Sequence, residues 1–232
     1  YVGHWVWFPI PHYVETFTTD KSGTVTTPDT LECGEYELVE IKAPYGYLLN
    51  DEPIRFTVST NTAYQMAEDD KTPIITVTKE DVSVKGCISV LKIGEQLTDV
   101  KTDENGHLQF IYQKLLVNGA QFVVKASENI YSADNQKDLI FKKDEIVAEL
   151  TTMNGEAQTD LLPLGKYKVY EVVASDGFVL NKEIKEVTLT YKDQETVIVT
   201  EDIEFENARQ KVELEVIKLD SEEETSLSGA EF

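Results

Sequence analysis

The chain contains the segment GEYELVEIKAPYGYLL at residues 34–49 and a second version of it, GKYKVYEVVASDGFVL, at residues 165–180. The two copies start 131 residues apart, and six of their sixteen positions are identical. A repeat of this length indicates that the chain is built from copies of one structural unit. Each copy also places a glutamate, Glu40 or Glu171, among apolar residues, where a carboxylate is costly unless it is paired or protonated.

The residues around the two copies have the periodicity of β-strands. Turn signals rich in Gly, Asn and Asp separate short runs that alternate in polarity or are β-branched. One polar segment, 127–138, could hold a helical turn, although its composition favours a loop. Many short strands with regular turns predict an all-β chain of antiparallel sandwiches. The clearest predicted strands are residues 56–59, 74–78, 87–92, 121–124, 187–191 and 197–200.

The repeat also predicts where the structural units begin. We call residues 1–83 the first unit, residues 84–210 the second unit and residues 211–232 the third unit. The third unit is predicted because KVELEVIK at 211–218 alternates again and SGAEF at 228–232 echoes an earlier NGAQF. Because the linkers have almost no length, we expect a stiff series of tandem sandwiches. We also expect the chain to be an excerpt from a longer protein.

Composition and charge exclude two classes of partner. The 232 residues carry a formal net charge of −22, and the sequence pI is about 4.4. Nucleic-acid binding requires a basic face, and an anionic membrane surface would repel this chain. The longest apolar run, Val6–Ile10, is too short to span a bilayer. The charge itself indicates a soluble, colloidally stable protein.

Two cysteines, Cys33 and Cys87, are too few for a disulfide framework, and each stands next to a glycine near a predicted strand end. We expect two small buried or half-buried thiols, with one bridge between them as the alternative. If the protein works outside the cell, a device other than disulfides must stabilise it.

No arrangement for a metal or a cofactor is visible in the sequence. His4, His12 and His107 lack the spacing of metal ligands. The acidic turns at 103–106 and 221–224 lack the oxygen-ligand register of a calcium loop, so solvated turns are expected.

An aromatic cluster near the N-terminus has two readings. Trp5, Trp7 and Phe8 could form a sugar-binding platform. The spacing of two residues between the tryptophans favours a half-buried strand instead.

In chain order, the second unit carries Lys-Gly before a strand that ends in lysine, then Gly-Ala-x-Phe, Gly-x-Tyr-x-Val-x-Glu, Ala-x-x-Gly-Phe and Phe-x-Asn. This order of motifs resembles the Cna B-type repeat, a prealbumin-like, immunoglobulin-like sandwich of SpaA-type pilins and adhesin stalks of Gram-positive bacteria. The resemblance extends over nearly the whole chain. It implies tandem antiparallel β-sandwiches joined by very short linkers, with no cofactor.

The resemblance further implies an intramolecular isopeptide bond between a lysine on the first strand and an asparagine on the last, assisted by an acidic residue. In this sequence the lysine is Lys92, the asparagine is Asn207 and the acid is Glu171. The lysine must be neutral to attack a carboxamide, and burial lowers a lysine pKa. A protonated carboxyl group can hydrogen-bond the amide and pass protons to the departing ammonia. For an isolated glutamate, an edge-strand carboxylate in solvent would be the simpler reading; its recurrence favours the isopeptide role.

The first and third units depart from this pattern. Glu40 is present and Asp81 stands at the asparagine position, five residues before Gly86, but no lysine precedes Lys21, which lies in a turn signal. We therefore expect no bond within the first unit, with an upstream donor strand as the alternative. In the third unit Lys218 fits the donor position, and its partner strand would lie beyond the printed sequence.

These observations imply a structural stalk segment of a bacterial cell-surface protein or pilin, which presents an adhesive tip away from the cell. The expected partners are neighbouring repeats of the same chain and a host extracellular protein or glycan, and the expected location is the cell-wall-anchored surface. The alternative is a ligand-binding adhesin module. An enzyme is not expected, because the sequence shows no nucleophilic triad or phosphate-binding loop.

Overall fold

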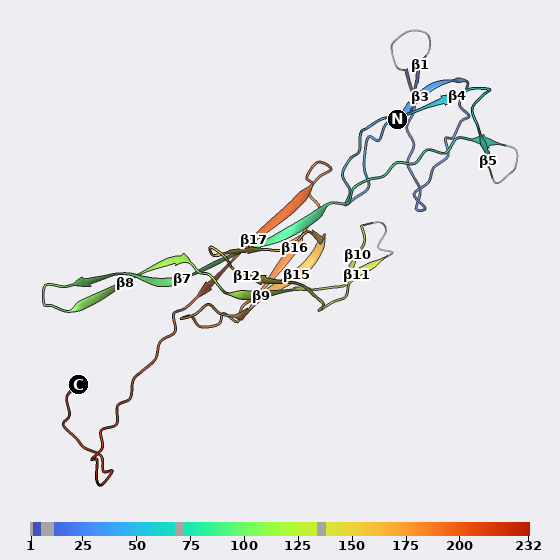
Figure 1. The fold of residues 1–232 in the computed structure, drawn as a ribbon. Helices are drawn as coiled ribbons and strands as arrows, with labels where there is room; N and C mark the ends of the chain where they lie inside the picture. The colour runs from blue at the N-terminus through green and yellow to red at the C-terminus, as the bar shows by residue number, and fades with distance from the viewer. Residues whose placement is uncertain (1, 6–11, 68–71, 134–137) are drawn as a thin grey trace.

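A computed structural model describes residues 2–5, 12–67, 72–133 and 138–232 of the chain. Within these ranges every regular element is a β-strand (Figure 1). This agrees with the predicted all-β class. Almost all strand pairs are antiparallel, and the exception, the pair β7–β17, lies at the centre of the site described below.

The first unit contains one four-stranded antiparallel sheet in the order β2-β1-β3-β4. A separate two-stranded ribbon of β5 and β6 follows it. The strands are β1 Val2–Trp5, β2 His12–Glu15, β3 Gly34–Leu38, β4 Ile54–Val58, β5 Gln65–Met66 and β6 Pro73–Ile74. Tyr36 of β3 is buried, stacks on Phe56 of β4 and donates its hydroxyl hydrogen to the Glu32 carbonyl.

The second unit contains two sheets that face each other. One has the order β12-β9-β15-β16, and the other is built around β7, which pairs with β8, β13, β14 and β17. A short ribbon, β10-β11, lies beside them. The strands are β7 Lys85–Thr102, β8 Leu108–Leu116, β9 Gln121–Ala126, β10 Ile130–Tyr131, β11 Leu139–Phe141, β12 Ile146–Thr151, β13 Glu156–Gln158, β14 Leu162–Pro163, β15 Gly165–Val173, β16 Ile184–Leu189 and β17 Ile198–Asn207.

The hydrophobic core lies between these two sheets. Alternate residues of β7, β9, β15 and β17 point inward, as the period of two residues in a strand requires. They include Ile88, Val90, Phe122, Val124, Tyr167, Val169 and Phe205, each 1% exposed or less. Fourteen buried residues form this one cluster, so the second unit has a core of its own.

The four-stranded sheets of the two units share one strand order. β2-β1-β3-β4 matches β12-β9-β15-β16 strand for strand. Tyr167 of β15 donates to the Pro163 carbonyl over 2.7 Å, as Tyr36 does to the carbonyl four residues before it. The repeated sequence thus forms the same local structure twice, while the division into tandem units remains a prediction.

β7 runs far beyond the core. After Gly94 it continues as a long hairpin with β8, which projects from the sandwich (Figure 1). Its turn is the predicted one, closed by a hydrogen bond from Gly106 N to Asp103 O. Gly94 itself has a packing reason, because a Cβ at this position would lie 2.3 Å from Cε1 of Phe178.

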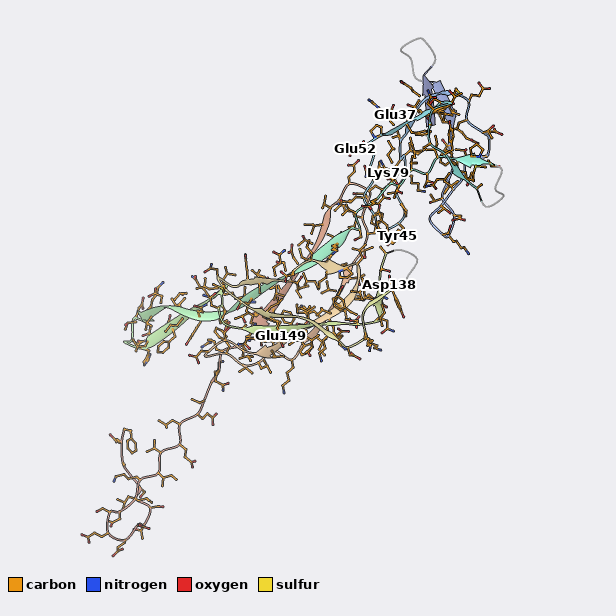
Figure 2. The ribbon with its side chains drawn as sticks, turned by 45° about the vertical axis from the view of Figure 1, so that its right-hand side comes forward. Glu37, Tyr45, Glu52, Lys79, Asp138 and Glu149 are labelled. Atoms are coloured by element: carbon orange, nitrogen blue, oxygen red, sulfur yellow. The ribbon has the colours of Figure 1, made fainter. Side chains whose placement is uncertain are left out.

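The first and second units meet at a close joint. Leu49 N donates to the Gln194 carbonyl over 3.0 Å, and the Tyr191 hydroxyl donates to the Tyr47 carbonyl over 3.1 Å. The rings of Tyr45 and Tyr191 pack with centroids 4.8 Å apart. Figure 2 shows Tyr45 at the narrow waist between the two parts. Backbone groups on one side are therefore fixed by groups on the other.

Three predicted secondary structures differ from those observed. The strand expected at 74–78 ends at Ile74, and residues 75–82 extend without a strand partner among the described residues. The strand expected at 211–218 is likewise not formed. Both segments lack a neighbour, and a strand is stable only when its backbone groups are paired. The loop expected at 127–138 contains the short strand β10.

Candidate functional site

β7 carries Lys92 into the core. The alternation that buries Ile88 and Val90 leaves the next inward position to Lys92, which is 0% exposed. β17 lies beside β7 in parallel, with Phe205 opposite Lys92 and Asn207 opposite Gly94. The first and last strands of the second unit are therefore neighbours, as the predicted chemistry requires.

Glu171 of β15 reaches across from the opposite sheet and lies between the other two side chains. Its Oε1 is 3.4 Å from Lys92 Nζ, and neither side chain is exposed. Asn207 Nδ2 donates to both carboxylate oxygens over 2.9 Å. Lys92 Nζ also donates to the Phe205 carbonyl over 3.3 Å. The structure brings together the three residues that the sequence singled out, and Glu171 does not reach solvent.

The surroundings of Lys92 make its neutral amine easier to form than in water. Burial lowers the pKa of Lys92, and the nearby Glu171 carboxylate opposes that shift. Phe122 and Phe205 pack with ring centroids 4.9 Å apart in the same core. A lysine that loses its proton readily in a site closed to water is a competent nucleophile.

A fourth residue, Asn181, holds the acid in place. Its backbone N–H donates to Glu171 Oε2 over 2.7 Å. Its side-chain Nδ2 donates to the Glu206 carbonyl over 2.9 Å, next to Asn207 in the chain. Asn181 was not predicted from the sequence, although an asparagine follows the repeated glutamate by ten residues in both copies, as Asn50 and Asn181.

One polar atom of the site has no partner. Asn207 Oδ1 is buried and makes no hydrogen bond to the described residues. Such an orphaned oxygen is unusual in a folded core, where nearly all buried polar atoms are paired. Glu171 contacts both the Lys92 amine and the Asn207 carboxamide, so an amine, a carboxyl group and an amide, the groups that amide exchange needs, lie together in one buried site.

Comparison with known proteins identifies the family. Residues 8–72 and 111–204 match the family described as SpaA, prealbumin-like fold domain. The chain belongs to this family. The matched segments cover most of the first unit and of the second unit, so both units contribute to the match.

Solved structures of low sequence identity resemble the chain. The Bacillus anthracis TIE protein is 22% identical, with a TM-score of 0.46 and coverage of 77% of this chain and 26% of that one. The major pilin SpaD from Corynebacterium diphtheriae is 19% identical, with a TM-score of 0.33 and coverage of 54% and 32%. The minor pilin GBS52 of Streptococcus agalactiae is 14% identical, with a TM-score of 0.36 and coverage of 82% and 66%. The chain thus spans about a quarter to a third of the first two structures. No curated protein matches it.

In this SpaA family chain, the first unit holds an incomplete counterpart of the site. Asn50 N donates to Glu40 Oε2 over 3.0 Å, and Asn50 Nδ2 donates to the Glu80 carbonyl over 3.1 Å, as Asn181 does in the second unit. Burial raises the pKa of Glu40, and the nearby Asp81 adds to this shift. Asp81 Oδ1 is buried without a partner among the described residues. Lys79 is the neighbouring cation, and its Nζ donates to the Glu52 carbonyl (Figure 2).

The remaining predicted residues lie away from both sites. Lys21 is in the predicted turn, and Lys218 is exposed. Cys33 is exposed and Cys87 is buried, both as free thiols. The expectation of a buried or half-buried Cys33 is wrong, since this cysteine is exposed in the segment directly before β3.

The remaining expectations concern the N-terminal aromatic residues, the histidines, metal binding and membrane-spanning segments. Trp7 and Phe8 lie outside the described residues, and Trp5 and His4 fall in β1 and His12 in β2. His107 pairs with Asp103 over 3.4 Å in the hairpin turn. The described part of the chain contains no group of three or more His, Cys, Asp or Glu residues suited to a metal. Among these residues there is also no helix long and apolar enough to cross a membrane.

Proposed function

We propose that this chain is a structural stalk segment of a bacterial cell-surface protein or pilin, held together by an intramolecular amide bond between Lys92 and Asn207. The observation that carries the proposal is the contact of Lys92, Glu171 and Asn207, which are 0%, 4% and 1% exposed. Membership of the SpaA family supports the structural role. Adhesion at a distal tip and an extracellular location belong to the same proposal.

The bond forms by exchange of one amide for another. The Lys92 nitrogen attacks Cγ of Asn207, the new Nζ–Cγ bond forms, and the Cγ–Nδ2 bond breaks with release of ammonia. Glu171, which contacts both nitrogens, takes a proton from Nζ and gives one to the departing Nδ2. Groups fixed in contact react with effective molarities of about 10⁵ M or more, so one slow event per molecule is sufficient.

The bond raises the free energy of unfolding and lets the second unit resist a pulling force. It closes the loop from residue 92 to residue 207, which the chain-entropy treatment of cross-links values at about 4–5 kcal/mol. The chain enters the second unit at β7 and leaves it at β17, and these strands are paired in parallel. A pulling force would shear them apart, and a covalent link between them carries the load past the intervening strands.

The mass of the denatured protein tests this proposal. One bond removes one ammonia, so the intact mass should fall by about 17 Da, and a proteolytic fragment should join the peptides of Lys92 and Asn207. Lys92→Met and Asn207→Ala should each restore the unreacted mass, while a control at an exposed lysine, Lys166→Met, should keep the loss. A parent protein of unreacted mass, after full maturation, contradicts the proposal.

A further inference from the structure

The site of Lys92, Glu171 and Asn207 lies at the end of the core of the second unit. Along β7 the last buried positions are Lys92 and Gly94, and beyond them β7 leaves the sandwich as the hairpin with β8 (Figure 1). Asn207 lies opposite Gly94 on β17. Because a glycine has no side chain, β7 itself does not close the site at this end.

The ring of Phe178 fills the place that a side chain at position 94 would take. The three heavy atoms nearest to a Cβ built on Gly94 all belong to this ring, and the nearest lies far inside van der Waals contact. Phe178 is half-buried, so its ring lies at the boundary between core and solvent. On the core side of the site, the buried rings of Phe122 and Phe205 pack against each other.

The backbone holds the Phe178 ring beside the reacting end of β17. Residues 177–179 pair with residues 208–210, which directly follow Asn207, and Phe178 forms a bridge pair with Arg209. Two backbone hydrogen bonds of 2.9 and 2.8 Å run from Val179 N to Ala208 O and from Gln210 N to Gly177 O. The position of the ring is therefore fixed relative to Asn207.

Water would compete with the amine in an open site. Glu171 can take a proton from water as it can from Nζ of Lys92, and it can protonate Nδ2 of Asn207 in either case. The water oxygen then attacks Cγ, the Cγ–Nδ2 bond breaks, ammonia leaves and residue 207 becomes an aspartate. Proximity alone does not prevent this hydrolysis, because a water held between the same groups is as well placed as the amine.

Water would also make the amine a poorer nucleophile. Burial is the main cause of the lowered pKa of Lys92, so access of solvent would raise this pKa back toward 10.5. An increase of one in the pKa lowers the neutral fraction of the amine about tenfold. Solvent access would therefore slow amide formation and permit hydrolysis at the same time.

We propose that Phe178 closes the site against water, and that this closure makes the Lys92 amine, and not water, the nucleophile at Asn207. Gly94 is the matching residue on β7, because a side chain at this position would displace the ring. The inference rests on the proposed function, since it concerns which nucleophile reaches the same Cγ. Phe178 is a positioning residue and takes no part in the proton transfers.

Peptide mass spectrometry at residue 207 tests the role of Phe178. In Lys92→Met, which has no amine, the closed site should keep Asn207 as an amide. In Lys92→Met/Phe178→Ala we expect hydrolysis to a carboxylate, which raises the mass of the peptide by about 1 Da. Its rate should exceed that in Lys92→Met by about 10²-fold or more, the usual contribution of a positioned acid–base group. Lys92→Met/Gly94→Ala should hydrolyse in the same way, because the new Cβ pushes the ring aside.

Three controls separate exclusion of water from a loss of structure. Lys92→Met/Phe178→Tyr keeps an aromatic ring, as Tyr47 does at the matching position of the first copy of the repeat, and should retain the amide. Lys92→Met/Phe110→Ala removes an exposed phenylalanine of β8 and should also retain it. Addition of Glu171→Ala to Lys92→Met/Phe178→Ala should stop the hydrolysis, whereas deamidation in an unfolded chain would continue.

The outcomes distinguish this inference from the proposed function. A parent protein of unreacted mass overturns the proposed bond, and this result is read without any change at Phe178. An amide retained at Asn207 in both Lys92→Met/Phe178→Ala and Lys92→Met/Gly94→Ala overturns the role of Phe178, even where the parent has lost its ammonia completely. Hydrolysis that persists without Glu171 is ordinary deamidation and overturns this role as well.

Discussion

Lys92 and Glu171 extend from opposite sheets and meet in the core with 3.4 Å between Nζ and Oε1, and neither side chain is exposed to solvent. A buried pair of this kind is a poor source of stability, because the desolvation of both groups offsets their attraction. Apolar residues of similar volume would fill the same space without the free-energy cost of desolvating two charged groups. The proposed reaction with Asn207 would give this pair a role other than stability.

Removing the acid should prevent the reaction. In Glu171→Ala we expect no loss of ammonia, because no group remains to move protons between Nζ and Nδ2. The free energy of unfolding should fall by at least the 4–5 kcal/mol or so of the cross-link, since Lys92 is also left buried without its partner. Intact mass and thermal unfolding measure both effects. Glu149→Ala, an exposed glutamate of β12 (Figure 2), should change neither; an unreduced melting temperature in Glu171→Ala would sink the idea of a stabilising bond.

Removing the nucleophile should be less damaging than removing the acid. Lys92→Met also prevents the bond and leaves Glu171 without its cation, but the carboxylate keeps its hydrogen bonds from Asn207 Nδ2 and Asn181 N. We expect its melting temperature to lie below that of the parent and above that of Glu171→Ala. Calorimetry of the parent, Lys92→Met and Glu171→Ala measures the order of their melting temperatures. The reverse order for the two variants would mean that Lys92 is stabilising as a cation.

The stability of the unbonded protein should depend on alkaline pH. In Asn207→Ala, Lys92 stays a free amine whose pKa burial lowers from its ordinary value of 10.5. Between that lowered pKa and 10.5 the unfolded chain binds more protons than the folded chain, so the free energy of unfolding should rise as pH rises through this window. Below the folded pKa the gain is absent. Urea unfolding at neutral and alkaline pH measures the slope, and the double variant Lys92→Met/Asn207→Ala should lack this component.

Asn181 should control the rate of bond formation. Asn181→Ala keeps the backbone N–H on Glu171 but loses the side-chain bonds to Glu206 O and from Glu183 N. We expect a loss of about 1 kcal/mol for each bond and slower release of ammonia, since β17 is held less firmly beside the acid. A mass time course after refolding measures the rate. Asn50→Ala removes the matching bonds from the first unit and should leave the rate in the second unit unaltered.

The sequence was sufficient to single out Lys92, Glu171 and Asn207, which the structure brings together, while the bond between them remains a prediction. Glu171 recurs as Glu40, and the alternation of β7 sets the inward direction of Lys92. No residue pattern predicted the order of the strands in the sheets, because pairing between β7 and β17 joins segments more than a hundred residues apart. Asn181 was not predicted because it lies one residue beyond the repeated segment, and because its direct bond to Glu171 uses a backbone donor, which every residue carries.

The errors have a common physical cause. Residues 74–78 and 211–218 have good strand composition, yet neither forms a strand, because local propensity does not supply a neighbouring edge. The hairpin beyond Gly94 is the opposite error, because it forms although its strands were not predicted. Only its turn was recognised, while β8 pairs with β7 over its whole length and provides the neighbour that stabilises both.

The joint at Tyr45 and Tyr191 affects how far apart the two ends of a chain of such units would lie. Flexible linkers let the separation of chain ends grow roughly with the square root of the number of links. Here Gln194 and Tyr191 hold the backbone at Leu49 and Tyr47 directly, so these contacts fix the direction of the first unit relative to the second. In a chain joined this way, reach increases in direct proportion to the number of units, and every added unit moves the far end outward by nearly its own length.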